Sequence, residues 1–113
     1  MKKTILVCGA TGFIGRNIIE HFANNENYKV IGVYHKRPPF IHEGVSWLQA
    51  DLTNPVQVYS VLEGVDILIQ AAAVTSGVFK IFSQPEIHIT DNVVMNSYLF
   101  RHCLLYTSDA ADE

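Results

Sequence analysis

The sequence has few cysteines and no stretch of apolar residues long enough to cross a membrane. Its two cysteines, Cys8 and Cys103, lie far apart and form neither a metal-binding nor a redox motif. A disulfide framework is therefore not expected, and the reducing cytoplasm is the predicted location. A membrane-spanning helix needs about 20 consecutive apolar residues, and no such run occurs. We therefore predict no membrane partner.

The chain also lacks an excess of positive charge. Eight lysines and arginines stand against eleven aspartates and glutamates, which gives a formal net charge of −3 at pH 7. Nucleic-acid-binding domains usually carry a strongly basic patch, so no nucleic-acid partner is expected. The five histidines show no metal-ligand spacing, and no metal site is predicted. The basic and then apolar start of the chain is too short in its apolar part for a signal peptide and is interpreted as a first strand.

The last residues differ in character from the rest of the chain. Residues 103–113, CLLYTSDAADE, resemble the translation of a transposase-type adapter used in DNA sequencing. The alternative is a natural acidic tail. A non-native tail has to be excluded from reasoning about the fold. We therefore expect one partial domain over residues 1–102, a non-native segment over 103–113, and a gene that continues past Arg101 or His102.

Apolar segments alternate in a way that predicts strands and helices in turn. Residues 3–8 form a short apolar run that ends at glycine, which suits a buried parallel strand. Further strands are expected over 28–34, which is rich in valine and isoleucine, and over 45–50 and 66–70. Strands that alternate with helices favour a parallel sheet with right-handed crossovers. The predicted fold class is α/β, the N-terminal part of a Rossmann-type doubly wound parallel sheet with strand order 3-2-1-4.

Helices are expected between these strands. In residues 13–24, the spacing of Ile14, Ile18 and Phe22 predicts one apolar face. A second helix should be capped by Thr53 or Asn54 and closed by Gly64. Residues 76–84 are expected to form a loop. Residues 85–102 should begin as a loop and continue as a helix with an apolar face made by Ile89, Val93 and Phe100.

A glycine-rich loop joins the first strand to the first helix. Residues 9–15 read Gly-Ala-Thr-Gly-Phe-Ile-Gly, the place where a dinucleotide-binding loop has to lie. Gly9 permits the turn out of the strand, Gly12 leaves room for a pyrophosphate, and Gly15 lets the helix approach the sheet. The first-turn N–H groups and the helix dipole favour phosphate there. No Gly-Lys-Ser/Thr follows, so this is not a P-loop. The alternative is an ordinary glycine turn.

The spacing G-x-x-G-x-x-G resembles that of the extended short-chain dehydrogenase/reductases, the NAD-dependent epimerase/dehydratase family. Asp51-Leu52 is similar to the family's adenine-binding pair, Ala71-Ala72-Ala73 to its small-residue segment beside the cofactor, and Asn92 to its Asn-Val in the following helix. The alternatives are that Asp51 caps a turn, that the alanines only pack closely, and that Asn92 is a surface residue. The predicted cofactor-binding residues are Gly9, Thr11, Gly12, Phe13, Ile14, Gly15, His35, Lys36, Arg37, Asp51, Leu52, Ala71, Ala72, Ala73 and Asn92.

The end of the second strand bears on the choice between NAD and NADP. NAD enzymes usually carry Asp or Glu there to bind both ribose hydroxyls, but residues 33–37 read Val-Tyr-His-Lys-Arg. Lys36 and Arg37 can pair with a 2′-phosphate, and the alternative is a solvated basic loop. We therefore favour NADP over NAD as the cofactor.

The resemblance also implies chemistry that this sequence does not contain. The family donates a proton from the tyrosine of a Tyr-x-x-x-Lys motif, whose lysine lowers the tyrosine pKa, and no such motif occurs here. No catalytic residue is predicted, and we expect no turnover from this chain alone. The resemblance implies a nucleotide-sugar epimerase, dehydratase or reductase as the parent, with a homodimer as one possible assembly. The alternative is a non-enzymatic NADP-binding sensor of the same fold.

Within the family, two segments are similar to GDP-L-fucose synthase and its relatives. These are residues 71–77, which are rich in alanine and contain glycine, and the asparagine-containing residues 91–97. That subgroup tends to carry histidine where Ala10 or Thr11 stands, which is a departure. Thr75 and Ser76 would then be candidates to touch the sugar or the nicotinamide, or else cap the loop.

Overall fold

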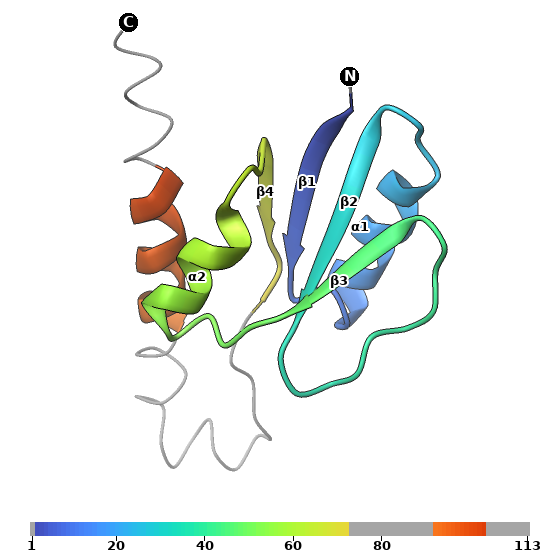
Figure 1. Cartoon of the computed structure of the whole chain (residues 1–113). Helices are drawn as coiled ribbons and strands as arrows, with labels where there is room; N and C mark the ends of the chain where they lie inside the picture. Colours follow the sequence, from blue (N-terminus) through green and yellow to red (C-terminus); the bar gives the residue numbers. More distant parts are fainter. Residues whose placement is uncertain (1, 73–91, 104–113) are drawn as a thin grey trace, which may run out of the picture. The chain divides into compact units, whose positions relative to one another are not determined.

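The computed structural model describes residues 2–72 and 92–103 of the chain. Its contacts divide the chain into two compact units. The first contains the described residues up to Ala50 together with Val61–Ala72, and the second contains Asp51–Ser60 together with the described C-terminal residues. The elements follow in the order β1 (Lys3–Cys8), α1 (Phe13–Ala23), β2 (Tyr28–Tyr34), β3 (Val45–Gln49), α2 (Pro55–Leu62) and β4 (Ile67–Gln70) (Figure 1).

All four strands lie in one parallel sheet in the first unit. Their order is β3-β2-β1-β4, and each neighbouring pair is parallel. In this register Val7 of β1 lies between Gly32 of β2 and Ile69 of β4, and Gly32 in turn lies opposite Trp47 of β3. The predicted fold class and strand order are therefore confirmed.

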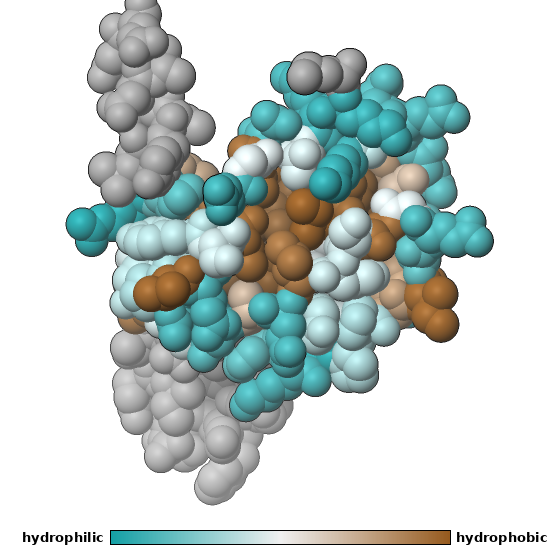
Figure 2. Space-filling model, viewed as in Figure 1, coloured by the Kyte–Doolittle hydropathy of each residue, from teal (hydrophilic) through white to brown (hydrophobic). Residues whose placement is uncertain are grey.

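The core of the first unit lies between α1 and the sheet. Its centre consists of fully or almost fully buried side chains from β1, the glycine loop, α1 and β2: Ile5, Val7, Ala10, Ile19 and Val30. Residues Ile5 to Cys8 of β1 are all buried, as is typical of a central parallel strand. On the sheet face turned away from α1, apolar residues also gather over the central strands (Figure 2).

Helix α1 presents a different face to the sheet from the one that the sequence predicted. Ile14 is 66% exposed, whereas Gly15 and Ile19 are its buried residues. Ile18 and Phe22 are half-buried at the edge of the core. The reason is that Gly15 has no side chain, so the helix packs most closely along the line from Gly15 to Ile19, and Ile14 is turned to the surface.

The predicted boundaries of the elements agree closely with the structure. Helix α1 ends at Ala23, with Asn24 as its C-cap. Strand β3 ends one residue before Ala50, whose N–H still donates to the Tyr34 carbonyl at 2.9 Å. Asp66 lies just before β4, where its carboxylate accepts the Thr4 N–H at 2.8 Å and its own N–H donates to the Thr4 carbonyl at 3.0 Å.

Helix α2 is capped by Asn54 rather than by Thr53. The Asn54 side-chain oxygen accepts the N–H groups of Val56 and Gln57, at 3.0 and 3.4 Å, as expected of an N-cap residue. Thr53 instead donates both its N–H and its hydroxyl to Asp51. Gly64 follows the helix with a φ of +76°, so it closes the helix as predicted.

Residues 92–103 are helical and belong to the second unit. Met95 and Leu99 are its buried apolar residues, whereas Val93 and Phe100 are more than half exposed. The predicted apolar face through Val93 and Phe100 is therefore wrong, and Ile89 lies outside the described residues. In the same unit the ring of Tyr59 stacks on that of His102 at a centroid distance of 5.3 Å.

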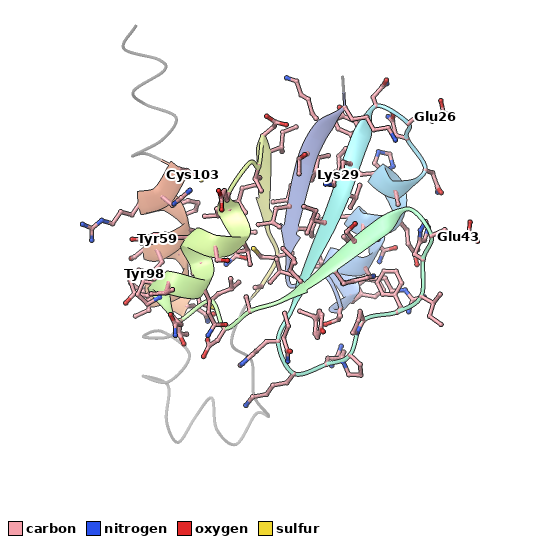
Figure 3. The ribbon with its side chains drawn as sticks, viewed as in Figure 1. Glu26, Lys29, Glu43, Tyr59, Tyr98 and Cys103 are labelled. Atoms are coloured by element: carbon pink, nitrogen blue, oxygen red, sulfur yellow. The ribbon has the colours of Figure 1, made fainter. Side chains whose placement is uncertain are left out.

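Three labelled side chains in Figure 3 belong to this second unit: Tyr59 of α2, and Tyr98 and Cys103 of the helical segment. Burial raises the pKa of the Cys103 thiol. Within the part of the chain that the structure describes, no helix is both long and apolar enough to cross a membrane. The same residues contain no group of histidine, cysteine and carboxylate side chains that could hold a metal ion.

Candidate cofactor-binding site

The glycine loop lies at the carboxyl end of β1 and leads directly into α1. Gly9 has a φ of +71°, a left-handed conformation that glycine adopts without steric cost. The turn is closed by a hydrogen bond from the Gly12 N–H to the Gly9 carbonyl at 3.1 Å. The Ala10 N–H donates to the Val33 carbonyl at 3.2 Å, which ties the loop to the end of β2.

The N-terminus of α1 is left open toward a ligand. Gly12 is the N-cap residue, no side chain caps the helix, and the first turn contains no acidic residue. The first N–H groups of a helix have no partner within the helix, and together with the helix dipole they attract anions. An uncapped N-terminus that follows a glycine turn is therefore suited to a phosphate group.

Gly9 is also in close contact with the end of β4. A Cβ built on Gly9 would lie 2.6 Å from the carbonyl carbon of Ala71 and 2.6 Å from the Cα of Ala72. The Ala71 N–H donates to the Cys8 carbonyl at 3.0 Å. The structure thus brings together the glycine loop and two of the alanines that the sequence singled out. Ala73 lies outside the described residues.

Gly12 differs from Gly9 and Gly15 because the protein leaves space beside it. Within residues 2–72 and 92–103, the one atom within 4 Å of a Cβ built on Gly12 is the Gly9 carbonyl oxygen at 3.4 Å, an ordinary van der Waals contact. The backbone at Gly12, with φ −78° and ψ 171°, is open to any residue. The fold itself therefore does not require glycine at this position, whereas a phosphate that approaches the backbone would.

Phe13 and Ile14, both predicted to bind cofactor, lie in the first turn of α1 with exposed side chains. Phe13 is 85% exposed and Ile14 66%. Neither side chain is part of the core of the first unit. Their backbone N–H groups are part of the uncapped first turn described above, so any contribution of Phe13 and Ile14 to phosphate binding is expected through the backbone.

The basic segment after β2 reaches the glycine loop. His35, Lys36 and Arg37 are all exposed. The Arg37 Nη1 donates to the Thr11 carbonyl at 3.3 Å, and the Gln49 side chain donates to the His35 carbonyl at 3.0 Å. No carboxylate occurs between Val33 and Arg37. Thr11 and Arg37, both predicted site residues, are therefore neighbours.

The remaining predicted site residues belong to the second unit. Asp51 Oδ1 accepts the Thr53 N–H and hydroxyl at 2.9 and 2.6 Å, and the Asp51 N–H donates to Gln57 at 2.7 Å. The turn-capping alternative for Asp51 is thus observed. Leu52 is buried and Asn92, at the start of the helical segment, is half-buried. The cofactor contacts expected of Asp51, Leu52 and Asn92 stay predictions.

Sequence reasoning missed a cluster of side chains next to the glycine loop. The guanidinium carbon of Arg16 lies 4.4 Å from the centre of the Phe40 ring, and the Phe40 ring contacts that of Trp47 edge-on, with 4.9 Å between centroids. These residues are far apart in the sequence, so no local pattern could have indicated the contact. The chain's single tryptophan was the one available signal.

Comparison with known proteins adds a family to this geometry. The model of the NAD dependent epimerase/dehydratase family matches residues 5–110. A sequence search of curated proteins found no significant match. Among solved structures, UDP-glucose 4-epimerase superposes with a TM-score of 0.78 and 23% identity over 93% of this chain and 33% of that one.

Two further structures show the same fold. Uronate dehydrogenase from Agrobacterium tumefaciens has a TM-score of 0.74 and 18% identity, covering 94% of this chain and 38% of its own. UDP-glucuronic acid 4-epimerase from Bacillus cereus, solved with UDP-glucuronic acid and NAD, has a TM-score of 0.73 and 22% identity, covering 88% and 36%. The chain thus spans between 33% and 38% of the length of these neighbours. With a Rossmann-type fold and a family model that matches nearly all of its residues, the chain belongs to the NAD-dependent epimerase/dehydratase family.

Proposed function

We propose that this chain is the NAD(P)-binding part of an enzyme that transfers hydride at a sugar carbon of a nucleotide sugar. The observation that carries the proposal is the open space at Gly12, beside the uncapped N-terminus of α1. Among the described residues, a Cβ at this position would meet no atom closer than 3.4 Å, so the space suits a ligand and is not used for packing within this part of the fold. The dinucleotide, when bound, supplies the hydride acceptor.

Each part of the first unit has a definite task in this proposal. The N–H groups at the start of α1 bind the pyrophosphate, and the left-handed turn at Gly9 directs them toward it. The backbone of Ala71 and Ala72 lies against Gly9, so the end of β4 forms the wall next to the loop. Small side chains at this wall leave room for a flat ring, as expected of the alanine segment beside the cofactor.

The nucleotide-sugar substrate class is supported by the structural neighbours. One of them holds UDP-glucuronic acid and NAD together, and another is a UDP-glucose 4-epimerase. Within this class, the resemblance to GDP-L-fucose synthase provides one specific candidate. The chain spans only 33% to 38% of these neighbours. We therefore propose that the proton donor and the substrate-binding residues lie in a longer cytoplasmic protein, which assembles as a homodimer.

The basic segment after β2 favours NADP over NAD in this proposal. Arg37 uses Nη1 for the Thr11 carbonyl, but a guanidinium has five N–H donors in a planar fork. Its other donors, together with the exposed Lys36 ammonium, are suited to a 2′-phosphate. A carboxylate, which would bind the two ribose hydroxyls of NAD, does not occur in this segment.

The test is a cofactor titration followed by a turnover assay on the full-length gene product. NADPH should bind more tightly than NADH, and cofactor reduction or oxidation should accompany conversion of at least one member of a panel of UDP- and GDP-sugars. Failure to bind either dinucleotide would overturn the proposal. Tight binding without turnover on any sugar would instead indicate an NADP-binding sensor of the same fold.

A further inference from the structure

The segment that joins β2 to β3 carries the two basic residues of the proposed cofactor site and one aromatic anchor. Lys36 and Arg37 open this segment, Pro38 and Pro39 follow, and Phe40 comes next. Lys36 and Arg37 are exposed, whereas Phe40 is half-buried against the core of the first unit. The position of this ring relative to its neighbours determines where the preceding basic residues can lie.

The Phe40 ring contacts the ring of Trp47, a residue of strand β3 in the sheet. The two rings meet edge-on at 79°, with 4.9 Å between centroids. Trp47 lies opposite Gly32 in the register of β2 and β3, and its indole fills the space above Gly32, where a Cβ would lie only 2.6 Å from Cζ3 of Trp47. Because the sheet fixes Trp47, it also provides a fixed support for Phe40.

The Phe40 ring also contacts Arg16 of α1. The guanidinium carbon of Arg16 lies 4.4 Å from the ring centroid, a distance typical of a cation–π contact. Arg16 Nε also pairs with Glu20 Oε1 at 2.9 Å, one turn further along α1. This ion pair favours the orientation of the guanidinium seen in the structure. The Arg16 N–H donates to the Gly12 carbonyl at 2.9 Å. Phe40 therefore contacts both Trp47 of the sheet and Arg16, near the start of the helix that follows the glycine loop.

The connection from Phe40 back to Arg37 is stiff. Proline fixes its own φ near −65° and restricts the preceding residue to extended conformations. With Pro38 and Pro39 between them, Arg37 and Phe40 have few relative orientations available. The Arg37 Nη1 contact with the Thr11 carbonyl, at 3.3 Å, is long for a hydrogen bond and exposed, so it cannot hold the guanidinium on its own.

From these contacts we infer that Phe40, held by its contacts with Arg16 and Trp47, is a positioning residue that holds Arg37 beside the glycine loop and thereby sets the preference for NADP over NAD. The inference rests on the proposed dinucleotide site and adds to it the element that orients the 2′-phosphate group. Phe40 and Arg16 act through Arg37 in this arrangement, and neither has to touch the cofactor.

The experiment is a double-mutant cycle in the full-length protein, with NADPH and NADH affinities measured for each variant. The variants are Phe40→Leu, Arg16→Gln and Arg37→Ala, together with the pairs Phe40→Leu/Arg37→Ala and Arg16→Gln/Arg37→Ala. Ile41→Ala is the matched control, because Ile41 is the neighbour of Phe40 and is fully exposed. The midpoint of thermal unfolding, measured for each variant, reports whether the substitution has disturbed the fold.

Phe40→Leu and Arg16→Gln should each weaken NADPH binding about three- to tenfold and leave NADH binding within about twofold. In the Arg37→Ala background, neither change should weaken NADPH further, since coupled residues are not additive. A purely structural role would lower both affinities in either background. Ile41→Ala should have no effect on either cofactor.

Two results would overturn the inference. One is an unchanged ratio of NADPH to NADH affinity in both Phe40→Leu and Arg16→Gln. The other is a loss of NADPH affinity in Arg16→Gln that is just as large in the Arg37→Ala background, which would indicate an effect of long-range charge alone. Arg16 is largely exposed, so this variant keeps the test valid even where Phe40→Leu impairs folding. If the unaltered protein bound neither dinucleotide, the proposed function itself would fail.

Discussion

The backbone of Gly9 occupies the place where a side chain on Gly15 would have to lie. A Cβ on Gly15 would be 2.8 Å from the Gly9 carbonyl carbon and 2.9 Å from the Cα of Ala10, and closer still to the Gly9 carbonyl oxygen. The turn after β1 and the first turn of α1 are thus packed backbone against backbone. This contact sets the direction in which the N-terminus of α1 points, and with it the direction of the N–H groups offered to a phosphate.

Gly15→Ala should therefore destabilise the fold. The methyl group can be placed only if α1 moves away from the sheet, and overpacking of this kind costs about 1–3 kcal/mol or more. Urea unfolding followed by circular dichroism would measure the loss. Gly12→Ala is the matched control, with an expected loss below about 1 kcal/mol, and equal losses in the two variants would contradict the packing argument.

Gly12→Ala should instead affect cofactor binding and leave the fold intact. The described part of the chain leaves room for the new methyl group, whose nearest neighbour there would be 3.4 Å away, but a pyrophosphate in contact with the loop backbone would collide with it. We expect at least about a tenfold loss of NADPH affinity, corresponding to roughly 1.4 kcal/mol. Gly12→Val should abolish binding. Unchanged affinity in fluorescence titrations of both variants would show that the pyrophosphate binds elsewhere.

Replacement of both Lys36 and Arg37 with alanine should lower the affinity for NADPH far more than that for NADH. Hydrogen bonds to charged groups contribute about 1.5–3 kcal/mol each, so a loss of tenfold or more is expected for NADPH. Lys29→Ala is a suitable control, since Lys29 is an exposed lysine of β2 (Figure 3). Equal losses for the two cofactors would rule out a role in 2′-phosphate binding.

Asn54→Ala should destabilise helix α2 by roughly 1 kcal/mol. The Asn54 side chain accepts two N–H groups of the first turn, those of Val56 and Gln57, and alanine leaves both without this partner. The change should appear as a lower urea midpoint with an unchanged slope. Ser60→Ala, at an exposed position in the same helix, should leave the urea midpoint unchanged. Thr53→Ala removes the hydroxyl that donates to Asp51 and keeps the Asn54 cap, so it measures the contribution of the Asp51 turn separately from that of the cap.

The two cysteines should differ in their reaction with a disulfide reagent. Burial raises the pKa of the Cys103 thiol, so its thiolate forms at higher pH than that of an exposed cysteine, and its reaction near neutral pH should be slower in the folded than in the unfolded chain. Cys8 is fully buried and should react only after unfolding. Stopped-flow measurements across a pH series, with Cys8→Ala to isolate Cys103, would check both statements.

Much of the fold and part of the candidate site follow from local patterns in the sequence. The apolar run that ends at Gly9, the glycine spacing and the alternation of strands with helices were sufficient for the parallel sheet and its order, because each depends on neighbouring residues. The turn at Gly9 was predicted for the same reason, and its left-handed φ is a finding of the structure. The choice of Asn54 over Thr53 as the cap of α2 was not, since both residue types are favoured at the N-cap and the two residues are adjacent.

The tertiary structure decided which faces are buried and which distant residues meet. Ile14 has the spacing of a core residue, yet it is exposed because the side-chain-free Gly15 lets α1 pack along a different line. In the same way, Met95 and Leu99, and not Val93 and Phe100, are the buried residues of the last helical segment. The sequence by itself determined the alternation of elements and the position of the phosphate loop, because turns and periodicity are local properties. Only the tertiary structure decided that Arg16, Phe40 and Trp47 form one cluster, because their contact depends on the strand register that places Trp47 over Gly32.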